Sequence, residues 1–305
     1  MISGEKILLT GASGQVGLKL GEFLARNNEV WGLARFGGGA EAKDRVAGLG
    51  MHPFAMDLAD PDFSQLPDDF TYVLHLSHTR RGPTEFLEAV DINAVGAGRV
   101  LQHCRNAKAA LVVSSTAVYS PPADVFTPLA EDGDIGRAWA PWAPTSPVSK
   151  VSLEAVARFC AEAFGLRTSI MRLNTLYGPG MAVMPVMNMD AVVAGNPVNT
   201  FADPYPHSPI HIEDMCDQLE ALLDAAAIPA QIINWCGDEA VTQREWCDMV
   251  ASWCGKPAEL VVNPIPGTPN GNVGNPAKRA AITGPCRRPF EQSFREIYEA
   301  RHGGG

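Results

Sequence analysis

The sequence lacks the features that mark several large classes of protein. No apolar run approaches the roughly 18 residues that a membrane-spanning helix needs. No long Lys/Arg tract is present, and the formal net charge is −10, from 34 acidic and 24 basic residues. A surface of this sign repels nucleic acid and anionic membranes, so we predict that neither is a partner.

Cysteine patterning excludes a second group of classes. The seven cysteines are odd in number and form no C-x-x-C pair, so we predict no disulfide framework, no zinc knuckle and no metal. Reduced thiols are typical of the cytoplasm. A strand-like run over residues 6–10 begins so early that we also expect no signal peptide. We therefore predict a cytoplasmic protein.

The composition provides enough apolar material for a large core. Of the 305 residues, 46% are hydrophobic and 19% are charged, which excludes a disordered protein. At about 150 residues per domain, the length predicts two lobes or one large α/β unit with an elaboration.

Periodicity places the first two thirds of the chain in the α/β class. Apolar runs of four to six residues, typical of buried strands, alternate with segments of helical period. This alternation predicts a parallel sheet with helices on both faces. The expected strands are 6–10, 29–34, 52–56, 71–76, 110–114 and 167–173, and the expected helices are 15–26, 84–106 and 148–164.

The pattern changes in two places. Residues 120–147 contain six prolines and no periodicity, which is more typical of a functional loop than of a linker. After residue 175 the elements become short, and 263–288 is expected to be mostly loop. Helices are expected at 213–226 and 242–254, and strands at 230–235 and 259–262. We predict a first domain over 1–175, to which part of 205–236 returns, and a smaller lobe over 176–305.

A glycine-rich turn follows the first strand and begins the first helix. Gly11 permits a tight turn, Gly14 lets a pyrophosphate approach the backbone, and Gly17 lets the helix pack on the strand. The helix N-terminus offers unpaired N–H groups and its positive dipole end to the anion. A glycine-rich surface turn is the alternative, but the strand before and the helix after favour a dinucleotide site. Further cofactor contacts are predicted from Ser13, Gln15 and Val16.

The end of the second strand selects the cofactor. An acidic residue there would bind the ribose 2′-hydroxyl of NAD, but Arg35 stands in its place and is positioned to pair with the 2′-phosphate of NADP. We therefore predict that NADP(H) is favoured over NAD(H), the alternative being that Arg35 is a solvated surface residue. Asp57 and Leu58 close the third strand, where they either approach the adenine or belong to an ordinary loop.

Short motifs along nearly the whole chain point to one family. They are the G-x-x-G-x-x-G turn, His75–Ser77, Asp91–Gly96, Ser114–Tyr119, Ser149–Lys150 with Glu154, Arg172–Gly180 and His211–Asp214. Together they resemble the extended short-chain dehydrogenase/reductases, the NAD(P)-dependent epimerase/dehydratase group. The resemblance implies a doubly wound Rossmann domain, cofactor contacts from Leu76 and Ser77, and a C-terminal substrate lobe. It also implies a homodimer formed by helices 84–106 and 148–164.

The resemblance breaks at one catalytic position. The family uses a Ser or Thr, a Tyr-x-x-x-Lys pair and a supporting Asn, which correspond by motif to Ser115, Lys150 and Asn93. Lys150 also serves the cofactor. The residue four before Lys150 is Ser146 where relatives have the tyrosine. A serine hydroxyl is far less acidic than a phenol and lies about 4 Å short of the same point.

Other groups are candidates for the missing proton donor. His78 follows the His75–Ser77 motif in a loop that lines the active site in relatives, and an imidazole acts near neutral pH. We expect His78, titrating near pH 6–7, to replace the tyrosine, and Ser146 not to be the donor itself. A water held by Ser146 is a second route.

The substrate lobe narrows the choice of substrate. Ser208 stands where relatives that act on nucleotide sugars often carry an arginine, which disfavours a diphosphate substrate. We predict an NADP(H)-dependent oxidoreductase or epimerase-like enzyme that acts on a small carbonyl or hydroxyl compound with an atypical proton relay. The alternative is a catalytically silent NAD(P)-binding regulatory or sensor protein. Retention of Ser115, Asn93 and Lys150 favours the enzyme.

Overall fold

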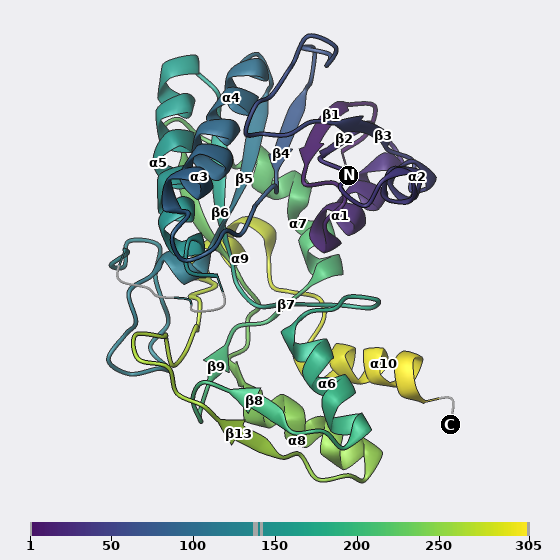
Figure 1. Ribbon diagram of the computed structural model, residues 1–305, viewed down its shortest axis with the longest axis vertical. Helices are drawn as coiled ribbons and strands as arrows, with labels where there is room; N and C mark the ends of the chain where they lie inside the picture. The colour runs from purple at the N-terminus through teal and green to yellow at the C-terminus, as the bar shows by residue number, and fades with distance from the viewer. Residues whose placement is uncertain (1, 137–139, 141–142, 304–305) are drawn as a thin grey trace. The chain divides into compact units, whose positions relative to one another are not determined.

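The chain divides into two compact units in the computed structural model, which describes residues 2–136, 140 and 143–303 (Figure 1). The first unit comprises Met1–Ser115, Ala143–Arg172 and Cys216–Ile233, and the second comprises Thr116–Trp142, Leu173–Met215 and Asn234–Gly305. Part of the predicted loop 120–147, namely 137–139 and 141–142, lies outside the described residues. Within the part that is described, no helix is both long and apolar enough to cross a membrane.

A seven-stranded sheet forms the centre of the first unit and confirms the predicted doubly wound α/β fold. Its strand order is β11-β6-β5-β4-β1-β2-β3, and the neighbours from β5 to β3 pair in parallel. The strand order reverses between β1 and β4. From β1 the chain adds β2 and then β3 on one side, and it then returns to add β4 on the other side of β1. The strands are β1 (Lys6–Thr10), β2 (Glu29–Ala34), β3 (His52–Ala55), β4 (Tyr72–His75), β5 (Ala109–Ser115), β6 (Thr168–Leu173) and β11 (Gln231–Trp235).

Apolar side chains on both faces explain why this sheet forms. Ile7, Leu8 and Leu9 of β1 are wholly buried, as expected for a parallel strand with both faces covered. A Cβ at Gly98 would lie 2.8 Å from Val156 Cγ1, so α4 and α5 approach closely, as Figure 1 also shows. The helices that contribute to this unit are α1 (Gln15–Ala25), α2 (Ala40–Gly48), α3 (Phe86–Val90), α4 (Gly96–His103), α5 (Ser146–Phe164) and α7 (Ile212–Asp224).

The predicted helix 84–106 is interrupted. Between α3 and α4 the chain forms a π-helical turn, Asp91–Val95. A π turn bonds each amide one residue further back than an α-helix does, and such turns are frequent at functional sites. Asn93, a predicted site residue, lies in the middle of this turn.

The second unit packs helices around a smaller apolar core. Its centre includes Val186, Met189, Trp246 and Phe294. Its described residues form a 3₁₀ turn, Thr116–Val118, and the helices α6 (Met184–Ala194), α8 (Gln243–Cys254), α9 (Ala277–Thr283) and α10 (Phe290–His302). Its two-stranded ladders join β7 (Leu176–Tyr177) to β10 (Ile210–His211), β9 (Pro206–His207) to β12 (Val241–Thr242), and β8 (Val198–Thr200) to β13 (Leu260–Val262).

Four helices of the two units differ from the sequence-based expectation. They are α2, α6, α9 and α10. α2 buries only Val46, so its sequence carries little apolar periodicity. α9 lies inside the segment 263–288 that was expected to be mostly loop. α10 does carry a readable signal, because Phe290, Phe294 and Ile297 are buried at helical spacing.

Candidate functional site

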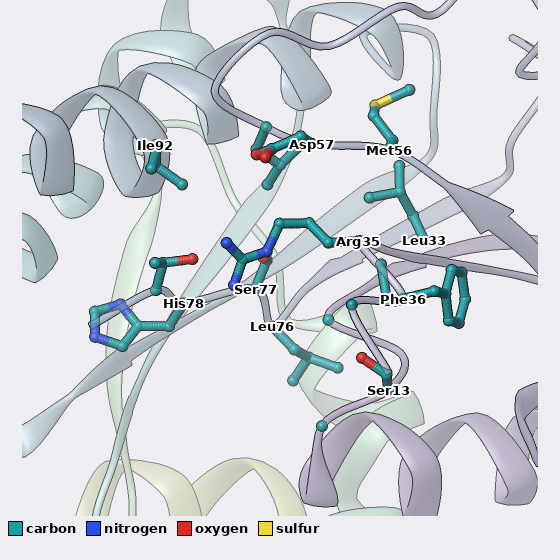
Figure 2. Close-up of a pocket in the computed structure, with 16 residues that line it drawn as sticks. Ser13, Leu33, Arg35, Phe36, Met56, Asp57, Leu76, Ser77, His78 and Ile92 are labelled. Carbon is teal, nitrogen blue, oxygen red and sulfur yellow. The ribbon is translucent and has the colours of Figure 1, made fainter. Parts of the chain in front are cut away.

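A cavity of about 500 Å³ opens at the C-terminal ends of β1 to β4 in the first unit (Figure 2). It lies where the strand order reverses, which is where open α/β sheets bind ligands. The structure brings nine of the predicted site residues to its lining: Gly11, Ser13, Gly14, Arg35, Asp57, Leu58, Leu76, Ser77 and His78. Three more, Gln15, Val16 and Gly17, belong to the first turn of α1 and are not among the lining residues.

The glycine turn is closely packed where glycine is required. Gly11 has a φ of +75°, and a Cβ there would lie 3.0 Å from the backbone nitrogen of Ser77. A Cβ at Gly17 would lie 2.2 Å from the carbonyl oxygen of Gly11. Gly14 is the N-cap of α1 and has no side chain to bond the first amides of the helix. Gly14 therefore leaves its backbone open to a ligand, and the positive end of the α1 dipole adjoins the cavity there as an anion site.

The Thr10 hydroxyl fixes the backbone of Leu76 and Ser77, which line the cavity. Its Oγ1 accepts hydrogen bonds from the backbone amides of Leu76 and Ser77, each at 3.2 Å. Both lone pairs are then occupied, so the hydroxyl donates to Nδ1 of His75, 3.0 Å away, and the imidazole carries its proton on Nε2. Burial lowers the pKa of His75 to about 3, and nearby Lys150 adds to the shift. The role of Thr10 cannot be predicted from the sequence, because nothing in the linear pattern places it against His75.

Arg35 is a charged side chain in the lining of the same cavity. It is exposed, and Figure 2 shows it extending from the end of β2 toward the middle of the cavity. The next residue, Phe36, is buried and has a φ of +48°, a conformation that favours glycine. Burial of that ring therefore holds the strained backbone that follows Arg35. Asp57, also exposed, lies in the cavity lining after β3.

Lys150 is buried beside the end of β5. Its Nζ donates a hydrogen bond to the carbonyl oxygen of Val113, at 2.6 Å. Burial lowers the pKa of Lys150 to about 8, and the carboxylate of Glu154 opposes that shift. Ser115, the last residue of β5, follows two positions after Val113 and is half-buried. Lys150 and Ser115 therefore both lie near the C-terminal end of β5.

Glu154 anchors the helix that carries Lys150. Its carboxylate accepts the Ser114 hydroxyl at 2.6 Å and the Arg172 Nη2 at 2.8 Å. The ion pair is almost fully buried, so breaking it by removing one partner is expected to cost about 3–5 kcal/mol. These three residues of the family motifs hold α5 against β5 and β6.

Asn93 clamps the loop that follows β4. Its Nδ2 donates to the carbonyl oxygen of Thr79 at 2.8 Å, and its Oδ1 accepts the amide of Thr79 at 2.7 Å. A third, longer bond of 3.3 Å runs to Ser149 Oγ. Because Thr79 follows His78, the amide of Asn93 fixes the backbone that presents the imidazole.

Ser146 and His78, the two candidates for the missing tyrosine, contact each other. Nε2 of His78 and Oγ of Ser146 lie 2.9 Å apart. Nδ1 of His78 is buried without a hydrogen-bond partner among the described residues. Burial lowers the pKa of His78 to about 2, and the charges of Lys150 and Arg80 add to the shift. The ring is therefore neutral in the range in which it was expected to titrate.

The chain matches the NAD dependent epimerase/dehydratase family over residues 7–236, from β1 through β11, and it belongs to that family. No curated protein sequence matches the chain significantly.

Several solved structures are similar over almost the whole chain. One is UDP-glucuronic acid 4-epimerase from Bacillus cereus, in complex with UDP-glucuronic acid and NAD, with a TM-score of 0.79, 22% identity and coverage of 96% of this chain and 98% of that one. Another is UDP-glucose 4-epimerase from Thermus thermophilus, in complex with NAD, with a TM-score of 0.80, 22% identity and coverage of 98% and 100%. UDP-N-acetylglucosamine 4-epimerase from Methanobrevibacter ruminantium M1, with UDP-N-acetylmuramic acid, has a TM-score of 0.81, 19% identity and coverage of 98% of each chain. At these identities the likeness shows the shared fold.

Proposed function

We propose that the protein is an NADP(H)-dependent oxidoreductase or epimerase-like enzyme that acts on a small carbonyl or hydroxyl compound. The observation that carries this proposal is the cavity in which Gly11, Gly14 and Arg35 lie together. The residues fit a dinucleotide, because the glycines leave room for a pyrophosphate beside the turn and the positive end of the α1 dipole attracts it. When bound, the nicotinamide supplies or accepts a hydride.

Arg35 is the reason why we propose that NADP(H) is preferred over NAD(H). A guanidinium forms charge-assisted, often bidentate hydrogen bonds to phosphate oxygens, and it offers no acceptor to a ribose hydroxyl. β2 ends without a carboxylate, so the usual partner of the NAD ribose is missing. The two epimerases from Bacillus cereus and Thermus thermophilus contain NAD, but their likeness to this chain is one of fold, so the preference proposed here rests on Arg35.

The proton in this proposal comes from Lys150 through Ser146. The two residues are four apart on α5, so their side chains lie on the same helix face. In carbonyl reduction, Ser146 Oγ gives a proton to the substrate oxygen, either directly or through one water that spans the missing ring. The Lys150 ammonium then restores that proton. His78, being neutral, orients the hydroxyl and does not supply the proton.

A silent NAD(P)-binding protein is the second candidate function. The observation that favours it is the same neutral His78, since a buried imidazole with a pKa of about 2 is a poor acid or base at neutral pH. Such a protein would bind the cofactor through the glycine turn and Lys150 without turnover. Tight NADPH binding without oxidation across a broad panel of small carbonyl compounds would favour this candidate.

The test of the cofactor assignment is calorimetric titration of NADPH and NADH. Hydrogen bonds to charged groups contribute about 1.5–3 kcal/mol, so Arg35→Gln is expected to weaken NADPH binding roughly 10–100-fold and to leave NADH binding nearly unchanged. Arg80→Gln removes one exposed positive charge from the same unit and is the matched control. Tighter binding of NADH than NADPH by the unaltered chain would overturn the assignment.

The proposal extends to the assembly and the compartment. We place the cofactor in the first unit and the substrate in the second. We also propose a homodimer formed by α3, α4 and α5, because Leu87 and Phe159 on these helices are 82% and 67% exposed. None of the seven cysteines, all of which lie in the described part of the chain, forms a disulfide, which supports a reducing compartment such as the cytoplasm.

A further inference from the structure

Three polar side chains lie along one face of α5. Ser146, Lys150 and Glu154 follow one another at intervals of four residues, and all three positions are helical. Residues four apart on a helix are neighbours, with Cβ atoms about 5–6 Å apart. Lys150 therefore lies between a hydroxyl on one side and a carboxylate on the other. The proposed proton transfer uses the hydroxyl and the ammonium, whereas the carboxylate takes no part in it.

The C-terminal end of β5 fixes both the ammonium and the carboxylate. Lys150 Nζ donates to the carbonyl oxygen of Val113 at 2.6 Å. The hydroxyl of the next residue, Ser114, donates to Oε1 of Glu154 at 2.6 Å. Both charged groups are shielded from solvent, since Lys150 is 6% exposed and Glu154 is 4% exposed. Consecutive residues of one strand therefore hold an ammonium and a carboxylate that belong to neighbouring turns of α5.

Arg172 supplies the counter-charge that Glu154 needs in the core. Its Nε lies 3.0 Å from Oε1 of Glu154 and its Nη2 lies 2.8 Å from Oε2, so the guanidinium contacts both carboxylate oxygens. A bidentate pair of this kind stabilises the negative charge of the carboxylate. Because its hydrogen bonds are made to Ser114 and Arg172, Glu154 acts on Lys150 through its charge and not through a direct bond.

Two imidazoles near the Lys150 ammonium are neutral. They belong to His75 in β4 and to His78 in the loop that follows it, and burial lowers their pKa values to about 3 and about 2. Burial also favours the neutral form of an amine, and a buried lysine without a counter-charge can have a pKa as low as about 5–6. The carboxylate of Glu154 opposes that effect and leaves the pKa of Lys150 at about 8.

We infer that Glu154 is a positioning residue of the proposed proton relay, and that its charge keeps the Lys150 ammonium protonated at neutral pH. Lys150 restores the proton of Ser146 only while it is an ammonium. The carboxylate one turn further along α5 therefore determines the pH range in which the relay works, and Arg172 holds that carboxylate in place. This inference rests on the proposed function, but the protonation state that it assigns is measurable without turnover.

The test is a pH titration of Lys150 in the full chain, followed by NMR of selectively ¹³C-labelled lysine and assigned by the signal that Lys150→Met lacks. We expect a midpoint near pH 8 in the unaltered chain. Glu154→Gln keeps the shape of the side chain and removes its charge, so the midpoint is expected to fall by about one pH unit or more. A folded Glu154→Gln variant with an unchanged midpoint would overturn the inference.

Two controls separate the charge of Glu154 from its anchoring role. Glu162→Gln removes a carboxylate from an exposed position of the same helix. Ser114→Ala removes one hydrogen bond from Glu154 while the charge remains. Both variants are expected to titrate like the unaltered chain. A shift in Ser114→Ala as large as that in Glu154→Gln would leave Glu154 an anchoring role only and would contradict the inference.

A double variant provides the same test if Glu154→Gln alone does not fold. Glu154→Gln combined with Arg172→Gln leaves no unpaired guanidinium in the core. We expect its midpoint to be lowered too, because Glu154 is the member of the pair that shares a helix face with Lys150, and an unchanged midpoint would contradict the inference. The pH profile of kcat should move with the midpoint. If no carbonyl compound is turned over even by the unaltered chain, the proposed function fails while the titration still decides the role of Glu154.

Discussion

Ser146 and Lys150 lie one helical turn apart, and only Lys150 has a pKa within the range where enzymes work, about 8. We predict that kcat for carbonyl reduction falls as pH rises through about 8, because the reaction consumes the ammonium proton. Oxidation of the alcohol is expected to rise through the same pH. The measurement is a pH profile of kcat in both directions.

Variants of Ser146 and His78 show which residue is responsible for the pH dependence of kcat. Ser146→Ala is expected to lower kcat by about 10²-fold or more, the usual contribution of a proton donor, while His78→Gln keeps a polar partner for Ser146 and costs less. Ser152→Ala, a change on the same helix away from the site, is the control. A limb near pH 6–7 that disappears in His78→Gln would instead restore the imidazole as the donor.

Four histidines with lowered pKa values make the protein sensitive to acid. Burial lowers the pKa values of His75 and His207 to about 3, of His78 to about 2, and of His211 below the ordinary value near 6.5. Below about pH 6.5 the unfolded chain therefore binds protons that the folded chain does not bind. The free energy of unfolding keeps its full value above that pH. As the pH falls below it, the free energy of unfolding decreases by about 1.4 kcal/mol per pH unit for each histidine. His207 contributes because it is buried in β9.

The measurement is denaturant unfolding between pH 7 and pH 5. We expect the free energy of unfolding to fall with a slope that corresponds to at least about three protons, and His207→Gln to lower the slope by about one. His52→Gln alters an exposed histidine and is the control. An unfolding free energy that does not vary over this range would refute the neutral state of these rings.

At the scale of elements, the glycines of the turn from β1 to α1 have two different roles, one in cofactor binding and one in the stability of the fold. A Cβ at Gly14 would meet only the Gly11 carbonyl oxygen, at 3.2 Å, whereas a Cβ at Gly17 would come within 2.2 Å of the same atom. We predict that Gly14→Val abolishes binding of NADPH and NADH with a modest change in melting temperature. Gly17→Val is expected to lower the melting temperature strongly. Calorimetry and thermal unfolding of both variants check this, and unchanged cofactor affinity in a folded Gly14→Val would contradict the phosphate-binding role.

The same scale shows what the sequence could and could not predict. Buried strands such as β1 and β5 consist mostly of continuous apolar residues, so their positions can be predicted from the order of residues in the sequence. The π turn at Asn93 leaves no such signal, because it changes the hydrogen bonding of a helix and not its residue types. The contact of His78 with Ser146 spans 68 positions and depends on how β4 and α5 pack. Motif positions predicted which residues gather at the cavity, but burial, which determines their pKa values, depends on the whole fold.

At the scale of the whole molecule, exposed apolar residues on α3 and α5 predict an assembly. Leu87 and Phe159 would be covered in the proposed homodimer, and large apolar side chains exposed on a shared helical face are typical of such contacts. We expect Phe159→Glu and Leu87→Glu to shift the mass in analytical ultracentrifugation from dimer to monomer. Phe126→Glu changes a half-exposed phenylalanine of the second unit and is the control. A monomeric unaltered chain at micromolar concentration would exclude the dimer.

The division of the chain into interleaved segments has a consequence for its synthesis. The first unit takes its edge strand β11 from Gln231–Trp235, so the sheet stays incomplete until about three quarters of the 305 residues have left the ribosome. Until then β6 presents an unpaired edge, which is the kind of surface that recruits strands from other chains. Cutting the gene after residue 175 would make that transient edge permanent. A nascent chain of this protein therefore has more need of protection from aggregation than one whose nucleotide-binding half is encoded without interruption.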